Sequence, residues 1–511
     1  MIRTLQQRPH TMPKRALATA TSSSPSKRTR RSPSPALDST TVPQDAAGKG
    51  KWKDWPAPRT QMDEAKEWIR ECIRDKHRVL LCPDKDADGL SSALVLSRTL
   101  RALSHPPSLT AIYHLPRGLN IHSPQASEGM LATFPNEGGP TRCIILDQGS
   151  RPVPPLLPPS QCKTLIIDHH LSSLFPSESQ VLSACHSLPV ATTSLLTYTL
   201  CAELVPEQRG KGALALGALV GVYGDLGSGK VKFGAEDEPW PASLAPVEKA
   251  LTKSALSKSV ALLNAPRRTP EFNVSDAYAA LEAAADAEEA KPGTSLKRIL
   301  GDEKLLEAKE RTSAETSRWQ AAPPVFSKDG RIAVVTVDSG YQIHPVIATR
   351  WTGTLRKAKT LVCVMCANTG YTPDHVHFSC RAPRHPDSPP PDLIAFLTSL
   401  KPLCDALSPD WSARVGEDFA RGHREATGGI IRREEWEVLC RAVEVGVKKE
   451  KTEGAGGGKG GKKVIDPGQK NTLDGFFKVK GKGKSAKKEE EDEEGDVKKE
   501  EKKEAKTIIV E

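Results

Sequence analysis

The stretch Thr164-Leu-Ile-Ile-Asp-His-His170 ends a short apolar run in one carboxylate and two imidazoles, and it decides the fold. Other apolar runs also lead to aspartates: 79–81 into Cys82-Pro-Asp-Lys-Asp-Ala-Asp-Gly89, 143–146 into Asp147, and 213–220 towards Asp225. A parallel α/β sheet gathers the carboxyl ends of its strands at one edge, where ligands bind. Carboxylates converging there with histidines predict a site for a hard cation.

The pattern of apolar residues along the chain predicts an α/β fold with a mostly parallel first sheet. Expected strands are 79–81, 108–115, 143–147 and 164–168, and expected helices are 61–76, 90–103, 192–204 and 211–223. A second, smaller α/β unit has expected strands at 331–337, 360–365 and 375–379 and helices around 391–406 and 433–445. We therefore predict a parallel-sheet domain at 56–227, a helical connector at 228–330 and a smaller α/β domain at 331–447.

Composition separates this central body from two tails that we predict to be disordered. Residues 1–55 are basic and rich in Ser and Pro, and residues 448–511 are Gly-rich and then Lys/Glu-rich. The net charge of +10 favours a polyanionic partner, although the basic tails alone could account for it. The 11 cysteines are scattered and no secretory segment is evident, so we expect reduced thiols inside the cell. No apolar stretch is long enough to span a bilayer, so we expect no membrane partner.

Two basic clusters in the N-terminal tail predict nuclear localisation. Lys14-Arg15 is separated by a short spacer from Lys27-Arg-Thr-Arg-Arg31, a spacing similar to a bipartite nuclear import signal. The alternative is a basic arm that contacts phosphates without any targeting role.

The predicted site offers mainly carboxylate oxygens with one or two imidazoles. These donors suit Mn²⁺ or Mg²⁺ better than zinc, because no cysteine cluster has zinc-site spacing. Two such ions about 4 Å apart would clamp a phosphodiester and activate a water. Asp86 and Asp88 would share one face of an extended segment, and Gly89 would allow a tight turn into a helix whose N-terminus suits a phosphate.

These motifs closely resemble those of the DHH phosphoesterase superfamily, in order and in spacing. Asp84-Lys-Asp-Ala-Asp-Gly89 is similar to its first motif, Asp147 to its second, Asp168-His-His170 to its third and Asp225 to its fourth. The resemblance implies a two-metal hydrolase in which Asp147 bridges the ions. It further implies these roles: Asp86 on the first ion; Asp88, His169 and Asp225 on the second; His170 beside the scissile phosphate; and Asp168 orienting the histidines.

The chain departs from many members of that superfamily at Cys82. They have a histidine four residues before the counterpart of Asp86, and this chain has Cys82. The third ligand of the first ion therefore stays open between Asp84, a water and the Cys82 thiolate. The alternative is that Cys82 is a buried structural cysteine.

A glycine-rich segment near the end of the body resembles the Gly-Gly-His-x-x-Ala-Ala-Gly motif of the DHH-associated C-terminal domain. It reads Arg421-Gly-His-Arg-Glu-Ala-Thr-Gly-Gly429, with Arg421 in place of the first glycine. The resemblance implies a substrate-binding loop in which main-chain amides approach phosphates. The predicted substrate contacts are Gly422, His423, Arg424, Gly428, Gly429 and, in His377-Phe-Ser-Cys-Arg381, the side chain of Arg381.

The resemblance favours a RecJ-like exonuclease acting on single-stranded DNA or RNA. One alternative is an oligoribonuclease or dinucleotide phosphodiesterase with a small substrate. Another is a non-catalytic replication or repair scaffold, as in the DHH-derived subunit of the eukaryotic replicative helicase. The sequence decides neither DNA against RNA nor the direction of degradation.

One apolar island interrupts the C-terminal tail. Lys470-Asn-Thr-Leu-Asp-Gly-Phe-Phe477 resembles the peptide that binds sliding clamps of the proliferating cell nuclear antigen type. Leu473, Phe476 and Phe477 would form its apolar plug, which predicts a clamp partner and a link to DNA replication or repair. A different partner that reads short motifs is the alternative.

Overall fold

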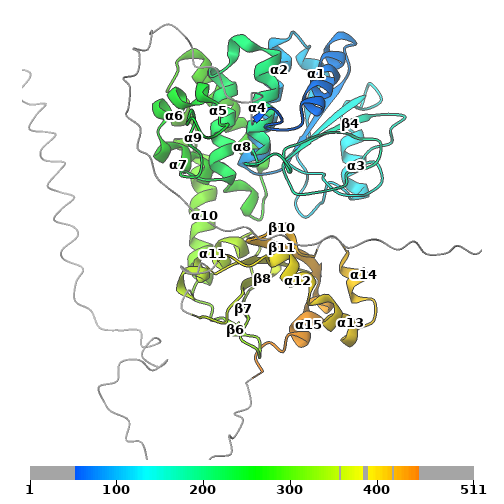
Figure 1. Ribbon diagram of the computed structural model, residues 1–511, viewed down its shortest axis with the longest axis vertical. Coiled ribbons are helices and arrows are strands. Elements are labelled where there is room, and N and C mark those ends of the chain that lie inside the picture. Colours follow the sequence, from blue (N-terminus) through cyan, green and yellow to red (C-terminus); the bar gives the residue numbers. More distant parts are fainter. Residues whose placement is uncertain (1–51, 356–357, 384–388, 417–418, 448–511) are drawn as a thin grey trace, which may run out of the picture. The chain divides into compact units, whose positions relative to one another are not determined.

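In the computed structural model, the first half of the described chain is built around a parallel five-stranded sheet (Figure 1). Its strands run in the order β2-β1-β3-β4-β5, and all neighbouring pairs are parallel. Nearly every residue of the central strands is buried, as expected for a sheet covered on both faces. The strands are β1 (Val79–Pro83), β2 (Thr110–Ile112), β3 (Arg142–Leu146), β4 (Lys163–Asp168) and β5 (Gln180–Ser183). The structure describes residues 52–355, 358–383, 389–416 and 419–447, so residues 1–51 and the predicted C-terminal tail lie outside the described residues. The predicted end of the N-terminal tail at residue 55 was wrong, because Trp55 is buried in the core and its indole N–H donates to the carbonyl of Pro189.

Alternate residues of these strands pack into two separate cores. Leu81, Ile144 and Ile167 face a core shared with most of the helices. Leu80 and Ile145 face the opposite core, which includes residues of α3. Helices therefore cover both faces of the sheet, and the predicted α/β class is confirmed. The helices are α1 (Arg59–Arg74), α2 (Ala87–Ala102), α3 (Pro124–Leu131), α4 (Thr193–Leu204) and α5 (Gly212–Asp225).

Helices α2 and α5 approach one another closely because α5 presents glycines to its neighbours. A Cβ atom added at Gly217 would lie 2.6 Å from a side-chain carbon of Val95 on α2. One added at Gly221 would lie 2.0 Å from Ser194 Oγ and 2.5 Å from Asp88 Oδ1. These glycines therefore allow α5 to pack directly behind the carboxylates at the edge of the sheet.

The segment predicted as a connector is helical, and its helices pack into the core of the first sheet. Leu263 and Leu281 are fully buried in that core. A short 3₁₀ turn, η5 (Pro266–Arg268), follows α7. The helices are α6 (Ala245–Leu251), α7 (Lys253–Leu263), α8 (Val274–Ala290), α9 (Leu296–Leu300) and α10 (Glu303–Trp319). The predicted domain limits at 227 and 330 remain predictions.

A six-stranded sheet forms the second half, in the order β10-β11-β9-β8-β7-β6. Only β7 and β8 are parallel among its hydrogen-bonded pairs in the described chain. Its strands are β6 (Val325–Phe326), β7 (Ile332–Val337), β8 (Cys363–Thr372), β9 (His375–Arg381), β10 (Arg421–His423) and β11 (Ala426–Arg432). Its helices are α11 (His344–Thr354), α12 (Leu393–Thr398), α13 (Lys401–Leu407), α14 (Trp411–Val415) and α15 (Arg433–Ala442).

Two local expectations from the sequence were wrong. Asp86 and Asp88 do not share an extended face, because α2 begins at Ala87 and Asp86 caps it by accepting from the amides of Asp88 and Gly89. The glycine-rich segment 421–429 is not an open loop, since β10 and β11 pair as an antiparallel hairpin. Gly89 is needed for close packing, because a Cβ there would lie 2.5 Å from the carbonyl oxygen of Asp84.

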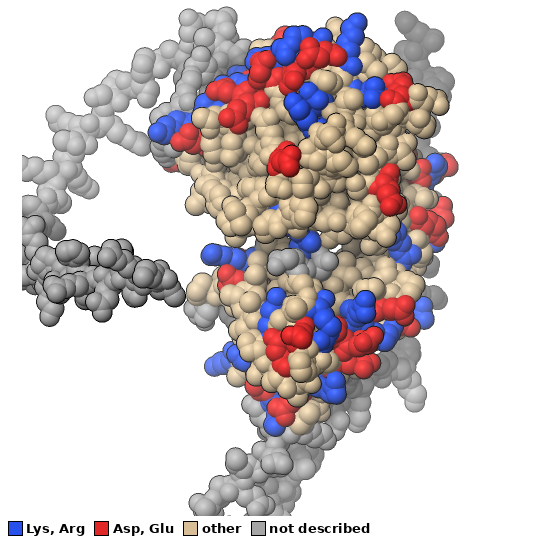
Figure 2. Space-filling view, turned by 90° about the vertical axis from the view of Figure 1, so that its right-hand side faces the viewer, with Lys and Arg blue, Asp and Glu red and all other residues tan. Residues whose placement is uncertain are grey.

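No helix among the described residues is long and apolar enough to cross a membrane. Charged side chains on the face shown in Figure 2 gather in groups of both signs, and a broad area of its upper part carries few of them.

Replacing Gly221 by alanine should destabilise the protein, although alanine is the better helix former. The added methyl group would overlap Ser194 and Asp88, and such overpacking costs about 1–3 kcal/mol. Gly353 on α11 is the matched control, because a Cβ there has no neighbour within 4 Å among the residues that the structure describes. Gly353→Ala should stabilise by about 0.5–1 kcal/mol. Urea unfolding of both variants measures the difference, and equal free energies of unfolding would contradict the packing argument.

Candidate metal centre

Asp147 lies at the centre of the site, directly after β3. Its backbone has φ of 63°, in the left-handed region that aspartate tolerates better than most residues. Its amide donates to the carbonyl of Ile167 at 3.0 Å, which continues the ladder between β3 and β4. The hydroxyl of Thr193 donates to Asp147 Oδ1 at 2.8 Å. The carboxylate is therefore held in one orientation by two neighbouring elements.

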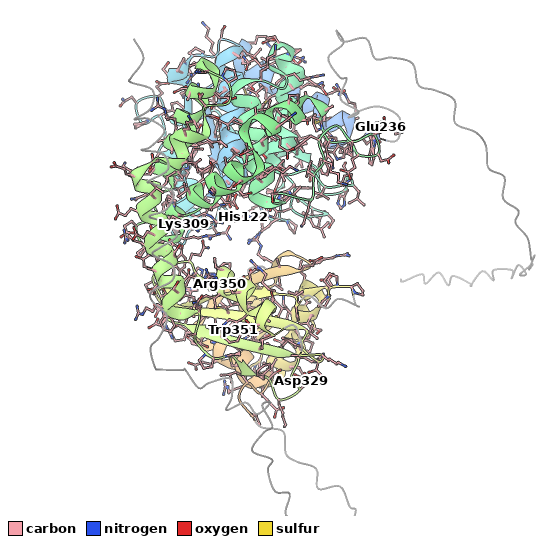
Figure 3. All side chains as sticks on the ribbon, turned by 90° about the vertical axis from the view of Figure 1, so that its left-hand side faces the viewer. His122, Glu236, Lys309, Asp329, Arg350 and Trp351 are labelled. Atoms are coloured by element: carbon pink, nitrogen blue, oxygen red, sulfur yellow. The ribbon has the colours of Figure 1, made fainter. Side chains whose placement is uncertain are left out.

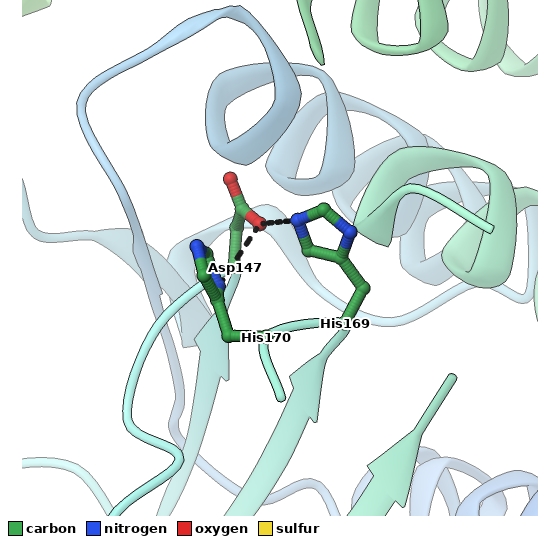
Figure 4. A group of neighbouring side chains, drawn as sticks. All are labelled: Asp147, His169 and His170. Atoms are coloured by element: carbon green, nitrogen blue, oxygen red, sulfur yellow. Dashed lines mark ion pairs between the residues drawn. The ribbon is translucent and has the colours of Figure 1, made fainter. Parts of the chain in front are cut away.

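Two groups of potential ligands share Asp147. One combines it with His169 and His170, and the other with Asp84 and Asp86. Within each group the ligand atoms lie within 4.8 Å of one another. Figure 4 shows the first group, in which the Asp147 Oδ1 atom lies 3.4 Å from His169 Nε2 and 3.9 Å from His170 Nδ1.

Asp225, the last residue of α5, reaches the same place from a helix rather than a strand. Its Oδ2 atom lies 3.9 Å from His169 Nε2, and its side chain is 30% exposed. The structure thus brings Asp84, Asp86, Asp147, His169, His170 and Asp225 together.

Asp168 lies behind the histidines and holds both in place. Its Oδ1 atom accepts from the amides of His169 and His170 and from His170 Nδ1, the last at 2.8 Å. Its Oδ2 atom accepts from the hydroxyl of Ser150 at 2.6 Å. Burial alone would raise the pKa of Asp168, but His170 and Ser150 lower it to about 2. Burial alone would lower the pKa of His170, but Asp168 raises it to about 9, so the two form a charged pair at neutral pH.

Asp88 points towards the start of α4. Its two oxygens accept from the amides of Thr193 and Ser194 at 2.8 and 3.0 Å. Burial raises its pKa to about 6, an effect that the His169 ring opposes. Asp88 belongs to none of the groups of potential ligands found among the described residues. Its predicted role as a metal ligand remains a prediction.

Asp84, and not Cys82, lies in the second group of potential ligands, beside Asp86 and Asp147. Cys82 lies on β1 with its side chain fully buried in the core that also contains Leu80 and Ile145. Burial raises the pKa of its thiol. Burial alone would raise the pKa of Asp84, but Lys85 and Arg267 lower it, so this carboxylate is charged. The geometry favours Asp84 over Cys82 as a ligand.

The electrostatics of the site favour a bound cation. Burial and the carboxylates of Asp88, Asp86, Asp168 and Asp84 raise the pKa of Asp147 well above its usual value. A divalent cation would remove this repulsion. Carboxylate oxygens with one or two imidazoles fit Mn²⁺ and also Mg²⁺, so the residues present fit the predicted metals.

A cavity of about 500 Å³ opens at the metal centre and is lined from both sheets. From the first half it is lined by Asp84, Asp147, Asp168 and His170, among others. From the second half it includes four of the residues in the glycine-rich hairpin: Arg421, Gly422, Gly428 and Gly429.

Other predicted substrate contacts do not line this cavity. Arg381 donates to Ser379 Oγ and to the carbonyl of Cys380, and Arg424 forms an ion pair of 3.3 Å with Asp392. The side chain of His423 lies outside the described residues. The substrate roles of these residues therefore remain predictions.

Several residues that position the site were missed from the sequence. Thr193 and Ser194 hold Asp88 and Asp147, and Ser150 holds Asp168. The run Thr192-Thr-Ser194 before an apolar helix is a capping signal that could have indicated them. Asn264 accepts from the amide of Ala87, and Arg267 lies 3.8 Å from Asp86. No local signal indicates that the connector supplies these two.

Cationic side chains gather beside the cavity without ion-pair partners in the described chain. Burial and the nearby Arg267 and Arg381 lower the pKa of Arg268 to about 10. Burial, Arg268 and Arg350 lower the pKa of Lys309. Lys309 and Arg350 lie on the same side of the molecule, on α10 and α11 (Figure 3). Cations that crowd one another in this way favour an anionic ligand.

Comparisons with known proteins agree with this geometry. A family model described as DHH family, N-terminal domain, matches residues 78–221. No curated protein matches the chain. The DHH domain of a member of a family of ribosomal proteins has a TM-score of 0.50 at 14% identity, and the match covers 75% of this chain and 90% of that one. This likeness shows a shared fold.

Other solved structures are similar at lower TM-scores. RecJ from Thermus thermophilus in complex with Mn²⁺ has a TM-score of 0.48 at 16% identity over 75% of this chain, and the match spans only 54% of that protein. CDC45 from Entamoeba histolytica has a TM-score of 0.38 at 11% identity, with 75% of this chain and 99% of that one covered. Residues 78–221, which carry most of the metal centre, are the part of this chain that is similar to the N-terminal domain of the DHH family.

Proposed function

We propose that this protein is a phosphodiesterase that uses two Mn²⁺ or Mg²⁺ ions and degrades single-stranded DNA or RNA from an end. The observation that carries the proposal is the pair of ligand groups that share Asp147 at the edge of the first sheet. Asp84 and Asp86 would hold one ion with Asp147, and His169 and Asp225 would hold the other. When bound, such cations supply Lewis-acid catalysis at a phosphodiester.

The chain's own residues would orient the substrate. The Asp168–His170 pair keeps His170 protonated at neutral pH, so that its ring can donate to a phosphate oxygen. Lys85 and Arg267 line the same cavity and would bind further phosphate oxygens. The hairpin glycines would let main-chain amides approach the backbone of the strand.

The cations outside the cavity favour a strand over a small substrate. Arg268 lies near Asp86 of the metal centre, and Lys309 lies near Arg268 and Arg350, so these three cations would follow the phosphates of a longer chain. The second candidate is hydrolysis of dinucleotides or short oligoribonucleotides. It is favoured by the cavity volume of about 500 Å³, which is typical of small-ligand sites. The third candidate is a non-catalytic scaffold, for which crowding buried carboxylates would bring a cost without a benefit.

Wild-type protein with MnCl₂ should degrade oligonucleotides labelled at either end. We expect the double variant Asp168→Ala/His169→Ala to lose at least about 100-fold in rate, because it removes a ligand and the group that orients His170. Gel analysis of single-stranded DNA and RNA substrates measures the rate, and the product ladder shows the direction of degradation.

Asp225→Asn is the second variant, because Asp225 is partly exposed and its replacement should leave the core intact. It should also lose activity while melting at the wild-type temperature. Cleavage of dinucleotides alone would select the second candidate. Wild-type cleavage rates no higher than those of the variants would refute the proposed enzymatic function.

Mn²⁺ should stabilise the protein, and Asp147→Asn should abolish that effect. At a concentration of about 100 times its dissociation constant, the ion would raise the free energy of unfolding by about 2.7 kcal/mol. Because the pKa of Asp147 is raised, its charged form disfavours folding at pH 7 when chelator is present. The asparagine side chain of this variant would keep the acceptor for Thr193 and tolerate the left-handed backbone. Thermal melts in EDTA and in MnCl₂ should therefore show the variant melting higher than wild type in EDTA and unchanged by Mn²⁺.

We propose, separately, that residues 470–477 bind a sliding clamp and that the protein works in the nucleus during DNA replication or repair. The support is the sequence pattern alone, because Leu473, Phe476 and Phe477 lie outside the described residues, as do both basic clusters. Calorimetry with a peptide spanning 466–482 should give binding that Phe476→Ala/Phe477→Ala removes. No heat at high micromolar peptide would contradict clamp binding and leave the phosphodiesterase proposal standing.

A further inference from the structure

We propose that the wall of the cavity formed by the second half of the chain, from β8, β9 and the start of α11, binds a nucleobase of the substrate. His344, Tyr371, His377 and Gln342 line this part of the cavity, and the metal centre lines the other. This inference rests on the proposed function and adds a subsite that reads the base rather than the phosphate.

His344 is the central observation. It is the first residue of α11, lines the cavity and is only 5% exposed. Its Nδ1 atom has no hydrogen-bond partner among the described residues. A buried polar atom without a partner destabilises a fold, so its presence at a cavity wall points to a ligand that completes its hydrogen bonding.

The neighbouring side chains that line the wall with His344 are the rings of Tyr371 and His377. The rings of Tyr371 and His377 meet edge to face at 4.8 Å, and that of His344 lies 6.1 Å from His377. Burial lowers the pKa of His377 to about 4 and that of His344 well below its usual value, so both imidazoles are neutral at pH 7. Each neutral ring offers one donor and one acceptor.

The protein holds this wall in place through Arg117. Its guanidinium lies over the Tyr371 ring at 4.4 Å and donates to the carbonyls of Pro270, Gly340 and Tyr371. The hydroxyl of Thr372 and His377 Nε2 lie 2.7 Å apart, which fixes that ring. A site assembled before its ligand arrives loses less entropy on binding.

Gln342 adds a neutral polar group. Its Oε1 atom accepts from Arg267 at 3.3 Å, which directs the amide N–H groups elsewhere. Arg267 in turn lies 3.8 Å from Asp86 of the metal centre. Gln342 therefore links the phosphate side of the cavity to the aromatic wall.

The chemistry of this wall fits a base better than the alternatives. A phosphate would need cations; the two histidines are neutral, and Arg117 donates to three carbonyls of the protein itself. A metal ion would need a grouped set of ligands, and the described residues of this wall form none. A nucleobase offers an aromatic face with mixed donors and acceptors on its edge, which matches neutral imidazoles, an amide and a tyrosine.

Calorimetry on the full-length chain with the four nucleoside 5′-monophosphates and with ribose 5-phosphate tests this inference. Ribose 5-phosphate has the same sugar and phosphate and lacks the base. Wild-type protein should bind at least one nucleotide about tenfold more tightly than ribose 5-phosphate. His344→Phe should remove most of that difference and leave the affinity for ribose 5-phosphate unchanged. The measured binding affinities do not depend on hydrolysis. The result can therefore be interpreted whether or not the activity assay detects cleavage.

Two further variants keep the result interpretable. His344→Gln retains a polar group in case phenylalanine disturbs folding, and thermal melts check both. His105→Phe is the matched control, because His105 is 2% exposed, has an Nδ1 atom without a partner in the described chain and does not line the cavity. It should keep the preference for nucleotides. Equal affinity of wild type for nucleotides and ribose 5-phosphate would overturn the inference, as would an unchanged preference in both folded His344 variants.

Discussion

Repulsion between carboxylates governs the arrangement around the metal centre. Asp84, Asp86 and Asp147 bring ligand atoms within 4.8 Å of one another, with Asp88 and Asp168 close behind. Buried like charges at this spacing oppose folding unless donors surround them. The structure supplies these donors from several elements. Amides at the start of α2 donate to Asp86, amides at the start of α4 donate to Asp88, and the imidazolium of His170 pairs with Asp168.

Helix packing follows from the same constraint. For the amides of α4 to reach Asp88, the start of that helix must lie directly against α2. Helix α5 must then fit behind both, and Gly221 is the position where any side chain would collide with Asp88. The glycines within the apolar run 213–220 and just beyond it therefore serve the site as much as the helix. Asp225 can reach His169 only because the helix that carries it lies so close.

The sequence allowed us to predict the site residues that lie at the ends of strands. It did not allow us to predict the residues that reach the site through contacts between distant parts of the chain. Parallel pairing of β3 with β4 aligns Leu146 with Ile167, so the next residue of each segment must meet the other, and the closeness of Asp147 and Asp168 could be anticipated. The spacing of Asp86 and Asp88 fits both an extended segment and a helix start, and it could not decide between them. Asn264 contacts Ala87 across 177 positions, which no local pattern encodes. The hairpin at 421–429 was hidden because glycine lacks strand propensity.

If the proposed function holds, the two walls of the cavity recognise different parts of the substrate. Carboxylates and cations hold any phosphodiester equally well, because a phosphate group looks the same in every nucleic acid and in many small molecules. Discrimination must then come from groups that contact the rest of the substrate, and we infer that these are the aromatic and amide groups that line the cavity from the second half of the chain. Keeping His344 and His377 neutral through burial prevents them from competing with the metal centre for phosphate. A charged wall would strengthen binding of every phosphate, and a neutral wall with an unsatisfied nitrogen strengthens binding only of a substrate that brings a matching edge.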